Sequence, residues 1–432
     1  MTDLRTILLP KLTNHRLDGL DLGAGLVYPN YAGYALSNIP ASIPGWLGLE
    51  TKLPQPPLAG EILQHTRGPY QNVILFLLDG LGLLNLQRML ERSEDYPVLA
   101  AWPRLLEGGL LAPLTSVALS TTSAALTSVW TAAAPSQHGV LAYEMYLKEF
   151  GVTANMILHS AAMFTGDVGG LIRAGFMPQS FLPVDRLGDR LAAAGAGAYA
   201  FQHASISRSG LSTMLLGGAE VAPFKNLSDL WVSLEGLLKW RAGKRTYTYA
   251  YWGDLDELAH RYGPQDERVV MEFDTFTQGF ERFMHHLPGL NVGKTLVLVT
   301  ADHGLIHTPV DPDLHLQYHP EFLAHLSMLP SGEARVPFLY VRPGHETAVQ
   351  EYATQAWPGR FRLINSQQAL AAGLFGPLPA YKRVEERLGD WLVVPQSNGY
   401  FWWDTRKENT MLGRHGGFSP EEMLIPLMAF EV

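Results

Sequence analysis

Three aspartates and three histidines of this sequence have the residue types and spacings of metal ligands. Asp79 follows the uncharged aliphatic run 72–78, and Asp302 and His303 follow a similar run, 295–301. Such runs are typical of strands buried in a parallel sheet, and open α/β folds bind ligands at the carboxyl ends of these strands. Polar residues that merely end a strand are the structural alternative.

Asp256 and His260 are four residues apart, which places both on one face of a helical turn. This spacing suits two ligands of one ion, and an exposed ion pair is the alternative. His415 precedes two glycines and the sequence Phe-Ser-Pro-Glu-Glu. The serine, proline and second glutamate of this sequence have the pattern of a capped helical turn, which would brace the loop of His415.

Together these six residues divide into two sites with nitrogen and oxygen ligands. That ligand chemistry suits zinc, and manganese or iron less specifically. Two divalent ions roughly 4 Å apart clamp the attacking and leaving oxygens of an in-line displacement. The predicted chemistry is therefore metal-assisted transfer of a phosphoryl-like group.

A hydroxyl-rich turn, residues 120–123, lies between a predicted strand end at 117–119 and a predicted helix at 124–130. Ser and Thr at this position usually cap the helix. A nucleophile is the sharper interpretation, since the backbone N–H groups of a helix start could hold its phosphoryl group. His138, in the turn that follows, has no acidic partner in the sequence and is interpreted as structural.

The remaining elements must bring these residues together. Further strands are predicted at 195–202 and 246–251, and apolar residues spaced by three and four predict a long amphipathic helix over 266–287. Alternating strands and helices favour an α/β fold. Length alone suggests about two or three domains, and one large α/β domain with an insertion fits equally well. We expect the single domain, over residues 1–432, as a three-layer α/β/α sandwich with a mostly parallel central sheet.

Two flanking regions are less regular. Residues 1–70 are rich in proline and glycine but apolar, and are expected to form an arm packed on the core. Residues 308–412 hold proline-rich turns and two short predicted strands, at 336–341 and 391–394. We interpret this second region as an inserted cap or rim.

Composition excludes several classes of protein. Hydrophobic residues make up 47% of the 432 residues and charged residues 17%, which supports a large core. The net charge of −9 and the absence of a Lys/Arg run disfavour a nucleic-acid polymer as partner. The lack of cysteine excludes disulfides and thiolate ligands. Without a signal-like start or a membrane-length apolar run, we expect a soluble, cytoplasmic protein that does not engage a membrane.

The order Asp, Thr, Asp-x-x-x-His, Asp-His-Gly, His-Gly resembles the alkaline phosphatase superfamily, and within it the type I phosphodiesterase/nucleotide pyrophosphatase branch. The resemblance runs from about residue 72 to residue 428. Its most specific pieces are Asp256-x-x-x-His260-x-x-Gly-Pro and Thr122, with a proline and the pair His138-Gly at the family's distance downstream.

The resemblance implies which residues do what. One zinc ion would be held by Asp256, His260 and His415. The other would be held by Asp79, Asp302 and His303, and it would also contact the nucleophile. Thr122 is the implied nucleophile, chosen by its spacing to the downstream motif, and Thr121 is the neighbouring alternative.

In one place the sequence departs from the branch. An Asn that helps to hold a phosphoryl oxygen is replaced, by simple counting, by Tyr143. The implied function is metal-dependent hydrolysis of a small phosphorylated substrate, with a nucleotide as one candidate. A phosphomonoesterase or a phosphonate hydrolase remains open on the same site. A phosphosugar mutase, a sulfatase and a non-catalytic metal-binding protein are less favoured, and the sequence leaves the oligomeric state open.

Overall fold

A computed structural model describes residues 2–164, 166–406 and 408–432. Its centre is an eight-stranded sheet in which, among the described residues, strand β17 alone runs antiparallel to its neighbours. The fold is therefore α/β with a mostly parallel sheet, as the sequence predicts. In spatial order the strands are β1 (Thr2–Asp3), β3 (Leu110–Thr115), β17 (Leu424–Glu431), β10 (Thr295–Thr300), β2 (Asn72–Leu78), β9 (Thr246–Trp252), β7 (Gly197–His203) and β8 (Glu220–Phe224).

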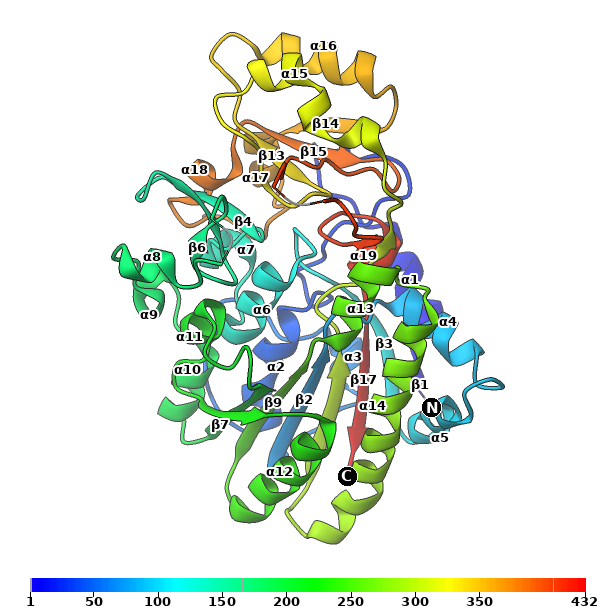
Figure 1. Cartoon of the computed structure of the whole chain (residues 1–432). Coiled ribbons are helices and arrows are strands. Elements are labelled where there is room, and N and C mark those ends of the chain that lie inside the picture. Colours follow the sequence, from blue (N-terminus) through cyan, green and yellow to red (C-terminus); the bar gives the residue numbers. More distant parts are fainter. Residues whose placement is uncertain (1, 165, 407) are drawn as a thin grey trace.

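Helices cover both faces of this sheet (Figure 1). On one face Phe76 of β2 packs against aromatic rings of the long helix α14 and of α12. On the other face Trp130 of α6 packs edge-on against Tyr247 and Tyr249 of β9. The two layers include α12 (Leu227–Trp240) and α14 (Glu267–His286) on the first face, and α6 (Thr122–Thr131) on the second. This arrangement confirms the predicted three-layer sandwich.

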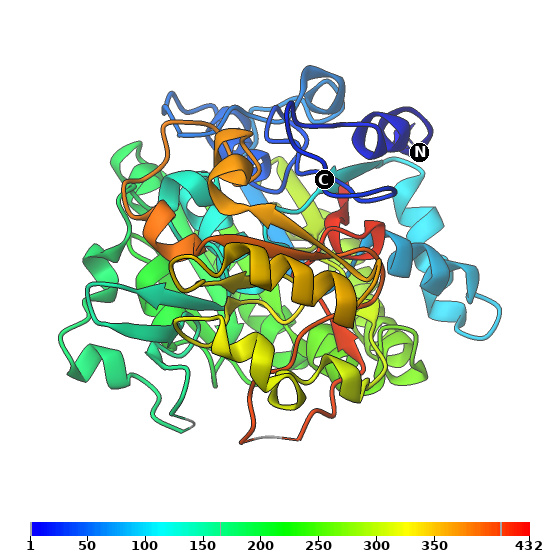
Figure 2. The same ribbon diagram turned by 90° about the horizontal axis from the view of Figure 1, so that it is seen from above.

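A second, seven-stranded sheet lies above the carboxyl ends of β2, β9 and β10 (Figures 1 and 2). Its strands come from two distant parts of the chain, because Gly332 pairs with Glu144. Residues 144–161 therefore share this sheet with strands from the 308–412 region. That the 308–412 region is a separate insertion stays a prediction. The strands are β14 (Phe361–Asn365), β15 (Trp391–Pro395), β13 (Pro337–Leu339), β12 (Ser331–Gly332), β4 (Glu144–Leu147), β5 (Val152–Asn155) and β6 (Ser160–Ala161).

The upper part of the molecule has a small core of its own, in which Phe322, Trp357 and Phe401 pack together. It is covered by α15 (Pro320–Ala324) and α16 (Glu346–Ala356). The N-terminal segment contains α1 (Arg5–Thr13), α2 (Asn38–Trp46) and α3 (Gly60–Leu63), and its apolar side chains join the main core. No helix in the described ranges combines the length and apolarity needed to cross a membrane.

One local prediction is wrong. Residues 117–119 do not end a strand, since β3 stops at Thr115 and the next six residues form a bend before α6 begins at Thr122. Hydroxyl groups fix this bend: Ser116 Oγ donates to the carbonyl of Asp302, and Ser120 Oγ donates to that of Gly417. These two hydrogen bonds attach the bend to Asp302 and to the loop that follows His415, which are parts of the predicted site.

Candidate metal centre and active site

The parallel pairing of β2 with β10 brings three predicted ligands together. Asp79 directly follows β2, while Asp302 and His303 lie just past β10. One ligand atom from each lies within 4.8 Å of the others, and all three residues are buried. Asp302 Oδ1 accepts the backbone N–H groups of Gly80 and His303, at 3.1 and 2.9 Å. These bonds fix the carboxylate at the edge of the sheet.

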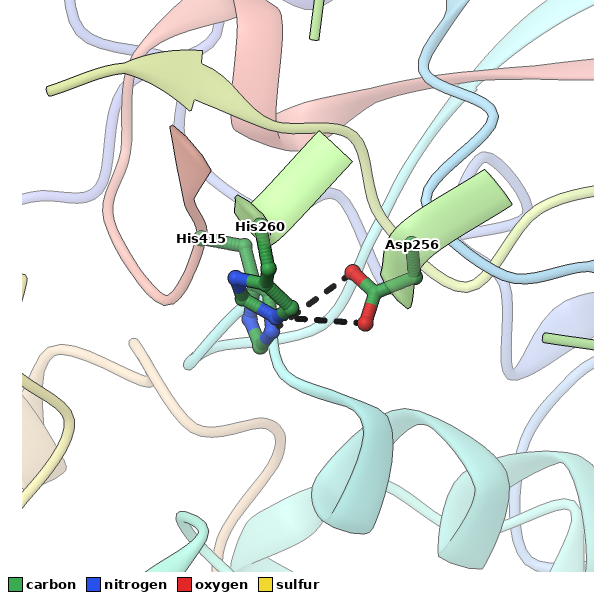
Figure 3. A group of neighbouring side chains, drawn as sticks. All are labelled: Asp256, His260 and His415. Carbon is green, nitrogen blue, oxygen red and sulfur yellow. Dashed lines mark ion pairs between the residues drawn. The ribbon is translucent and has the colours of Figure 1, made fainter. Parts of the chain in front are cut away.

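A second group forms beside the first. Asp256 and His260 lie on α13 (Asp254–Tyr262), which follows β9, and His415 lies on the loop after β16 (Gly413–Arg414). Their ligand atoms also lie within 4.8 Å of one another (Figure 3). His260 Nε2 is 3.1 Å from Asp256 Oδ2, and the ring of His415 stacks on that of His303 at 3.8 Å between centroids. The two groups are thus neighbours.

The hydrogen bonds of the histidines leave one nitrogen of each ring for a metal. Nδ1 of His260 lies 2.8 Å from the carbonyl oxygen of Gly413, and Nδ1 of His415 lies 3.1 Å from that of Ser120. A carbonyl only accepts, so each Nδ1 carries a proton, and Nε2 of each ring is the atom that faces the carboxylate of Asp256 and would bind a metal. Backbone bonds of this kind orient the histidine ligands of metal sites.

Ionised carboxylates carry the negative charge that balances a bound metal cation. Asp79 Oδ1, Asp256 Oδ1 and Asp302 Oδ2 are buried and have no hydrogen-bond partner among the described residues. Buried oxygens without partners are costly unless a cation or a donor satisfies them. The residues present therefore fit divalent ions at both groups.

The pKa values of the aspartates and of His415 reflect burial and the close approach of charged groups. Burial raises the pKa of Asp79, and the carboxylates of Asp302 and Asp256 raise it further. Burial likewise raises the pKa of Asp302. For Asp256 burial acts in the same direction, but the facing histidines, His260 first, bring its pKa below the ordinary value. Burial, helped by nearby His303, lowers the pKa of His415 well below its usual range.

Thr122 faces the first group. It is the first residue of α6, and its Oγ1 lies 3.2 Å from His303 Nε2 and 3.5 Å from Asp79 Oδ2. Thr121 is the residue before the helix, and its hydroxyl donates instead to Oε1 of Glu333. The structure therefore places the hydroxyl of Thr122, and not that of Thr121, against the candidate ligands.

Tyr143 lies close to this region but contacts it indirectly. Its backbone N–H donates to Oε1 of Glu333 at 3.0 Å, and its phenol oxygen accepts from Asn155 Nδ2 at 2.6 Å. Burial raises the pKa of Tyr143 to about 12 and that of Glu333 to about 8. Within the described residues, no hydrogen bond or ion pair joins Tyr143 to the six candidate ligands. Its role in binding substrate stays a prediction.

Two residues of the site were not predicted from the sequence. Glu333 comes from the turn between β12 and β13, where no sequence pattern marks it. Tyr251 donates a hydrogen bond to Oδ2 of Asp79. A signal for Tyr251 exists, because Tyr247, Tyr249 and Tyr251 alternate along β9 and so share one face of the sheet.

Comparison with known proteins now identifies the family. The profile described as type I phosphodiesterase / nucleotide pyrophosphatase matches residues 73–418, most of the 432-residue chain. The chain belongs to this family. Its members are phosphoester hydrolases that depend on metals, in keeping with the two groups of candidate ligands. No curated protein matched the sequence.

Solved structures of the family's fold are similar over most of their length. Murine ectonucleotide pyrophosphatase/phosphodiesterase 5 is 14% identical, with a TM-score of 0.58 over 83% of this chain and 88% of its own. Phosphonoacetate hydrolase from Sinorhizobium meliloti 1021, in complex with phosphonoformate, is 17% identical, with a TM-score of 0.59 over 82% and 89%. At these identities the likeness establishes the alkaline-phosphatase-like fold.

Proposed function

We propose that this protein is a phosphodiesterase that uses Thr122 as nucleophile and two zinc ions as cofactors, with manganese or iron as alternative metals. The observation that carries the proposal is the position of Thr122 Oγ1, 3.2 Å from His303 Nε2 and 3.5 Å from Asp79 Oδ2. The hydroxyl thus faces one group of candidate ligands, and the second group adjoins it through the stacked rings of His303 and His415.

Each group of residues has a distinct task. Asp79, Asp302 and His303 would hold the ion beside the threonine oxygen, and the second triad the other: Asp256, His260 and His415. Bound ions would lower the pKa of the threonine hydroxyl and neutralise charge on the leaving oxygen. Catalysis of phosphoryl transfer is then mostly positioning and charge stabilisation.

The chain's own residues account for the bond changes. Oγ1 of Thr122 forms a bond to phosphorus as the bond from phosphorus to the leaving alcohol breaks on the opposite side, and the proton lost by Thr122 is taken up by the leaving alkoxide through solvent. Water then attacks the threonine ester, releases the phosphoryl product and restores the hydroxyl. Free N–H groups in the first turn of α6 supply donors and a positive dipole end for the phosphoryl oxygens.

Two similar solved structures, each with a bound ligand, support this proposal. One is an inactive threonine-to-alanine variant of the murine ectonucleotide pyrophosphatase/phosphodiesterase 5, in complex with AMP. The other is phosphonoacetate hydrolase with phosphonoacetate. AMP is a phosphate ester and phosphonoacetate is a phosphonate, so a small substrate with a phosphoryl or phosphonyl group is the natural one to test here.

Replacement of Thr122 by alanine tests the nucleophile. We expect Thr122→Ala to lower kcat by at least about 10³-fold, the scale seen when a catalytic nucleophile is removed. Metal content, measured by elemental analysis, should stay near that of the unchanged protein because six ligands remain. Thr121→Ala is the matched comparison. Full activity of T122A together with loss of activity in T121A would transfer the role to Thr121.

A phosphonate hydrolase is the second candidate, favoured by the similarity to phosphonoacetate hydrolase. The two functions differ in the bond that breaks, P–O in a diester and P–C in a phosphonate. A panel of bis-p-nitrophenyl phosphate, p-nitrophenyl phosphate and phosphonoacetate separates diester, monoester and phosphonate hydrolysis. A higher kcat/KM for phosphonoacetate than for either ester would favour the phosphonate hydrolase over the phosphodiesterase.

A further inference from the structure

A small cavity of about 70 Å³ lies beside the proposed nucleophile. Thr122 and Leu126 of α6 form one wall, and Gln202 of β7 lies on another. The helix α11 (Gly210–Leu215) and the loop before it close the remaining side with aliphatic side chains, Leu211 among them. The cavity is thus mostly apolar and shares a wall with the reacting hydroxyl.

Two polar groups of this cavity lack a hydrogen-bond partner among the described residues: Nε1 of Trp130, which is a donor, and Oε1 of Gln202, which is an acceptor. Gln202 is 4% exposed. The two serines that also line the cavity are already bonded: Ser209 Oγ donates to Ser212 Oγ, and Ser212 Oγ donates to the carbonyl of Ile206. A buried acceptor left unpaired is costly, so this oxygen fits a ligand that carries a donor.

In-line displacement decides which part of a substrate could enter the cavity. Oγ1 of Thr122 approaches phosphorus on one side, and the leaving group departs on the opposite side. A group that lies in a cavity walled by Thr122 itself is therefore not the leaving group. It is the alcohol that stays on phosphorus after the first bond breaks.

The size of the cavity limits that alcohol. An apolar cavity of about 150 Å³ holds one benzene molecule, so about 70 Å³ corresponds to a few non-hydrogen atoms. Sites for drug-sized ligands are several times larger, roughly 300–1,000 Å³. A nucleoside is too large for the space, and aliphatic walls are unfavourable for a charged phosphoryl oxygen.

We propose that this cavity holds the retained alcohol of a phosphodiester, and that this alcohol is a short aliphatic group with one hydrogen-bond donor directed at Oε1 of Gln202. The inference rests on the proposed function, since it assumes a diester attacked by Thr122. It narrows the substrate class from phosphodiesters in general to those that retain a small hydroxyalkyl-like group, and it excludes a retained nucleoside.

The zinc-loaded protein can be tested with three p-nitrophenyl diesters that differ in the retained alcohol: 2-hydroxyethyl, ethyl and thymidine 5′. The hydroxyl of the 2-hydroxyethyl ester can itself displace p-nitrophenol, so the rate with Thr122→Ala under the same conditions is subtracted. We expect the corrected kcat/KM to be highest for 2-hydroxyethyl, at least about tenfold above ethyl because of the added hydrogen bond, and lowest for thymidine. A thymidine ester that is hydrolysed as well as the 2-hydroxyethyl ester would overturn the inference. Hydrolysis of the ethyl ester reports separately on the proposed function, because ethyl fits the cavity without the hydrogen bond, whereas failure of the proposed function would abolish turnover of every diester.

Two variants test whether the side-chain amide of Gln202 causes the preference for the 2-hydroxyethyl ester. Gln202→Leu keeps the volume but removes the acceptor, so the ratio of kcat/KM for 2-hydroxyethyl over ethyl should fall to about one. Gln278→Leu, the same change at an exposed position of α14, should keep the ratio of the unchanged protein. An unchanged ratio in Q202L would contradict the inference.

Direct binding gives a measurement that does not depend on turnover or on a folded variant. Calorimetry with the unchanged, zinc-loaded protein should show 2-hydroxyethylphosphonate binding more tightly than ethylphosphonate, and both more tightly than AMP. Tighter binding of AMP would indicate a nucleoside subsite and would overturn the assignment of the cavity.

Discussion

Histidines of this protein differ in what their two ring nitrogens contact, and this difference decides their roles. In His138 both nitrogens are used within the protein: Nδ1 accepts the N–H of Val140 at 3.1 Å, and Nε2 lies 3.0 Å from the hydroxyl of Ser128. His260 and His415 each bond a carbonyl through Nδ1 and leave Nε2 towards the carboxylate of Asp256. A fully bonded, neutral ring has a structural role, which the sequence also suggested for His138.

His138 should make stability depend on pH. Burial lowers its pKa to about 3, and the charge of Arg387 acts in the same direction. The unfolded chain, with a pKa near 6.5, therefore binds the proton more readily, and acidification below that value favours unfolding. We expect His138→Gln to lose less stability on acidification, by about 1.4 kcal/mol for each pH unit between 6 and 4. Urea unfolding of both proteins at pH 7 and pH 5 measures this, and parallel pH profiles would contradict it.

Tyr143 is proposed to donate a hydrogen bond to a phosphoryl oxygen. Asn155 donates to the phenol oxygen, so the phenol proton is left for another acceptor. Removal of one donor to a developing oxyanion costs roughly 10²-fold in kcat, and we expect Tyr143→Phe to show a fall of this order with little change in KM. Steady-state kinetics with bis-p-nitrophenyl phosphate measures both constants. A variant whose kcat equals that of the unchanged protein would remove Tyr143 from the site.

At the scale of elements, a buried ion pair joins the upper sheet to the loop of His415. Arg335, from the turn after β12, makes two hydrogen bonds to the carboxylate of Glu422, at 2.9 and 2.8 Å. Both side chains are fully buried. Glu422 also accepts the N–H of Gly417 at 2.8 Å, and it completes the cap of α19 (Pro420–Met423) with Ser419. The pair thus holds the loop that presents the histidine.

Loss of Arg335 should affect both stability and metal binding. Arg335→Met leaves Glu422 buried and unpaired, a change that typically costs about 3–5 kcal/mol. Because the loop of His415 loses its anchor, we also expect metal affinity at that triad to fall about 10- to 100-fold. Chemical denaturation and zinc titration measure the two effects. Arg362→Met, which breaks an exposed pair with Asp21, is the control and should change stability by about 1 kcal/mol or less.

Sequence patterns predicted those elements that carry a long periodic signal. The uncharged runs of β2 and β10 and the apolar spacing of α14 each extend over six residues or more, and the structure confirms all three. Strands such as β12, with two residues, carry no such signal. Their pairing with β4 depends on contacts between segments almost 190 residues apart. Glu333 belongs to that junction, so its position beside Thr121 could not be predicted.

For the molecule as a whole, the candidate site concentrates negative charge inside an already acidic protein. The chain carries a net charge of −9, and Asp79, Asp256 and Asp302 converge at one end of the central sheet. The sequence predicted these residues because parallel strands meet at one edge. It could not show that one oxygen of each carboxylate lacks a hydrogen-bond donor and faces a histidine, because this depends on how the loops close over the site. Like charges this close favour unfolding unless cations balance them.

Removal of metal should therefore destabilise the whole protein and not only stop turnover. An ion present at 100 times its Kd stabilises the folded state by about 2.7 kcal/mol, so treatment with a chelator should lower Tm, and added zinc should restore it. The variant Asp79→Asn tests the repulsion among these carboxylates in the opposite direction. It removes one of the crowded carboxylates, so its metal-free form should melt above the metal-free unchanged protein, while zinc should stabilise it less. Equal Tm values for the two metal-free proteins would show that repulsion among these carboxylates contributes little.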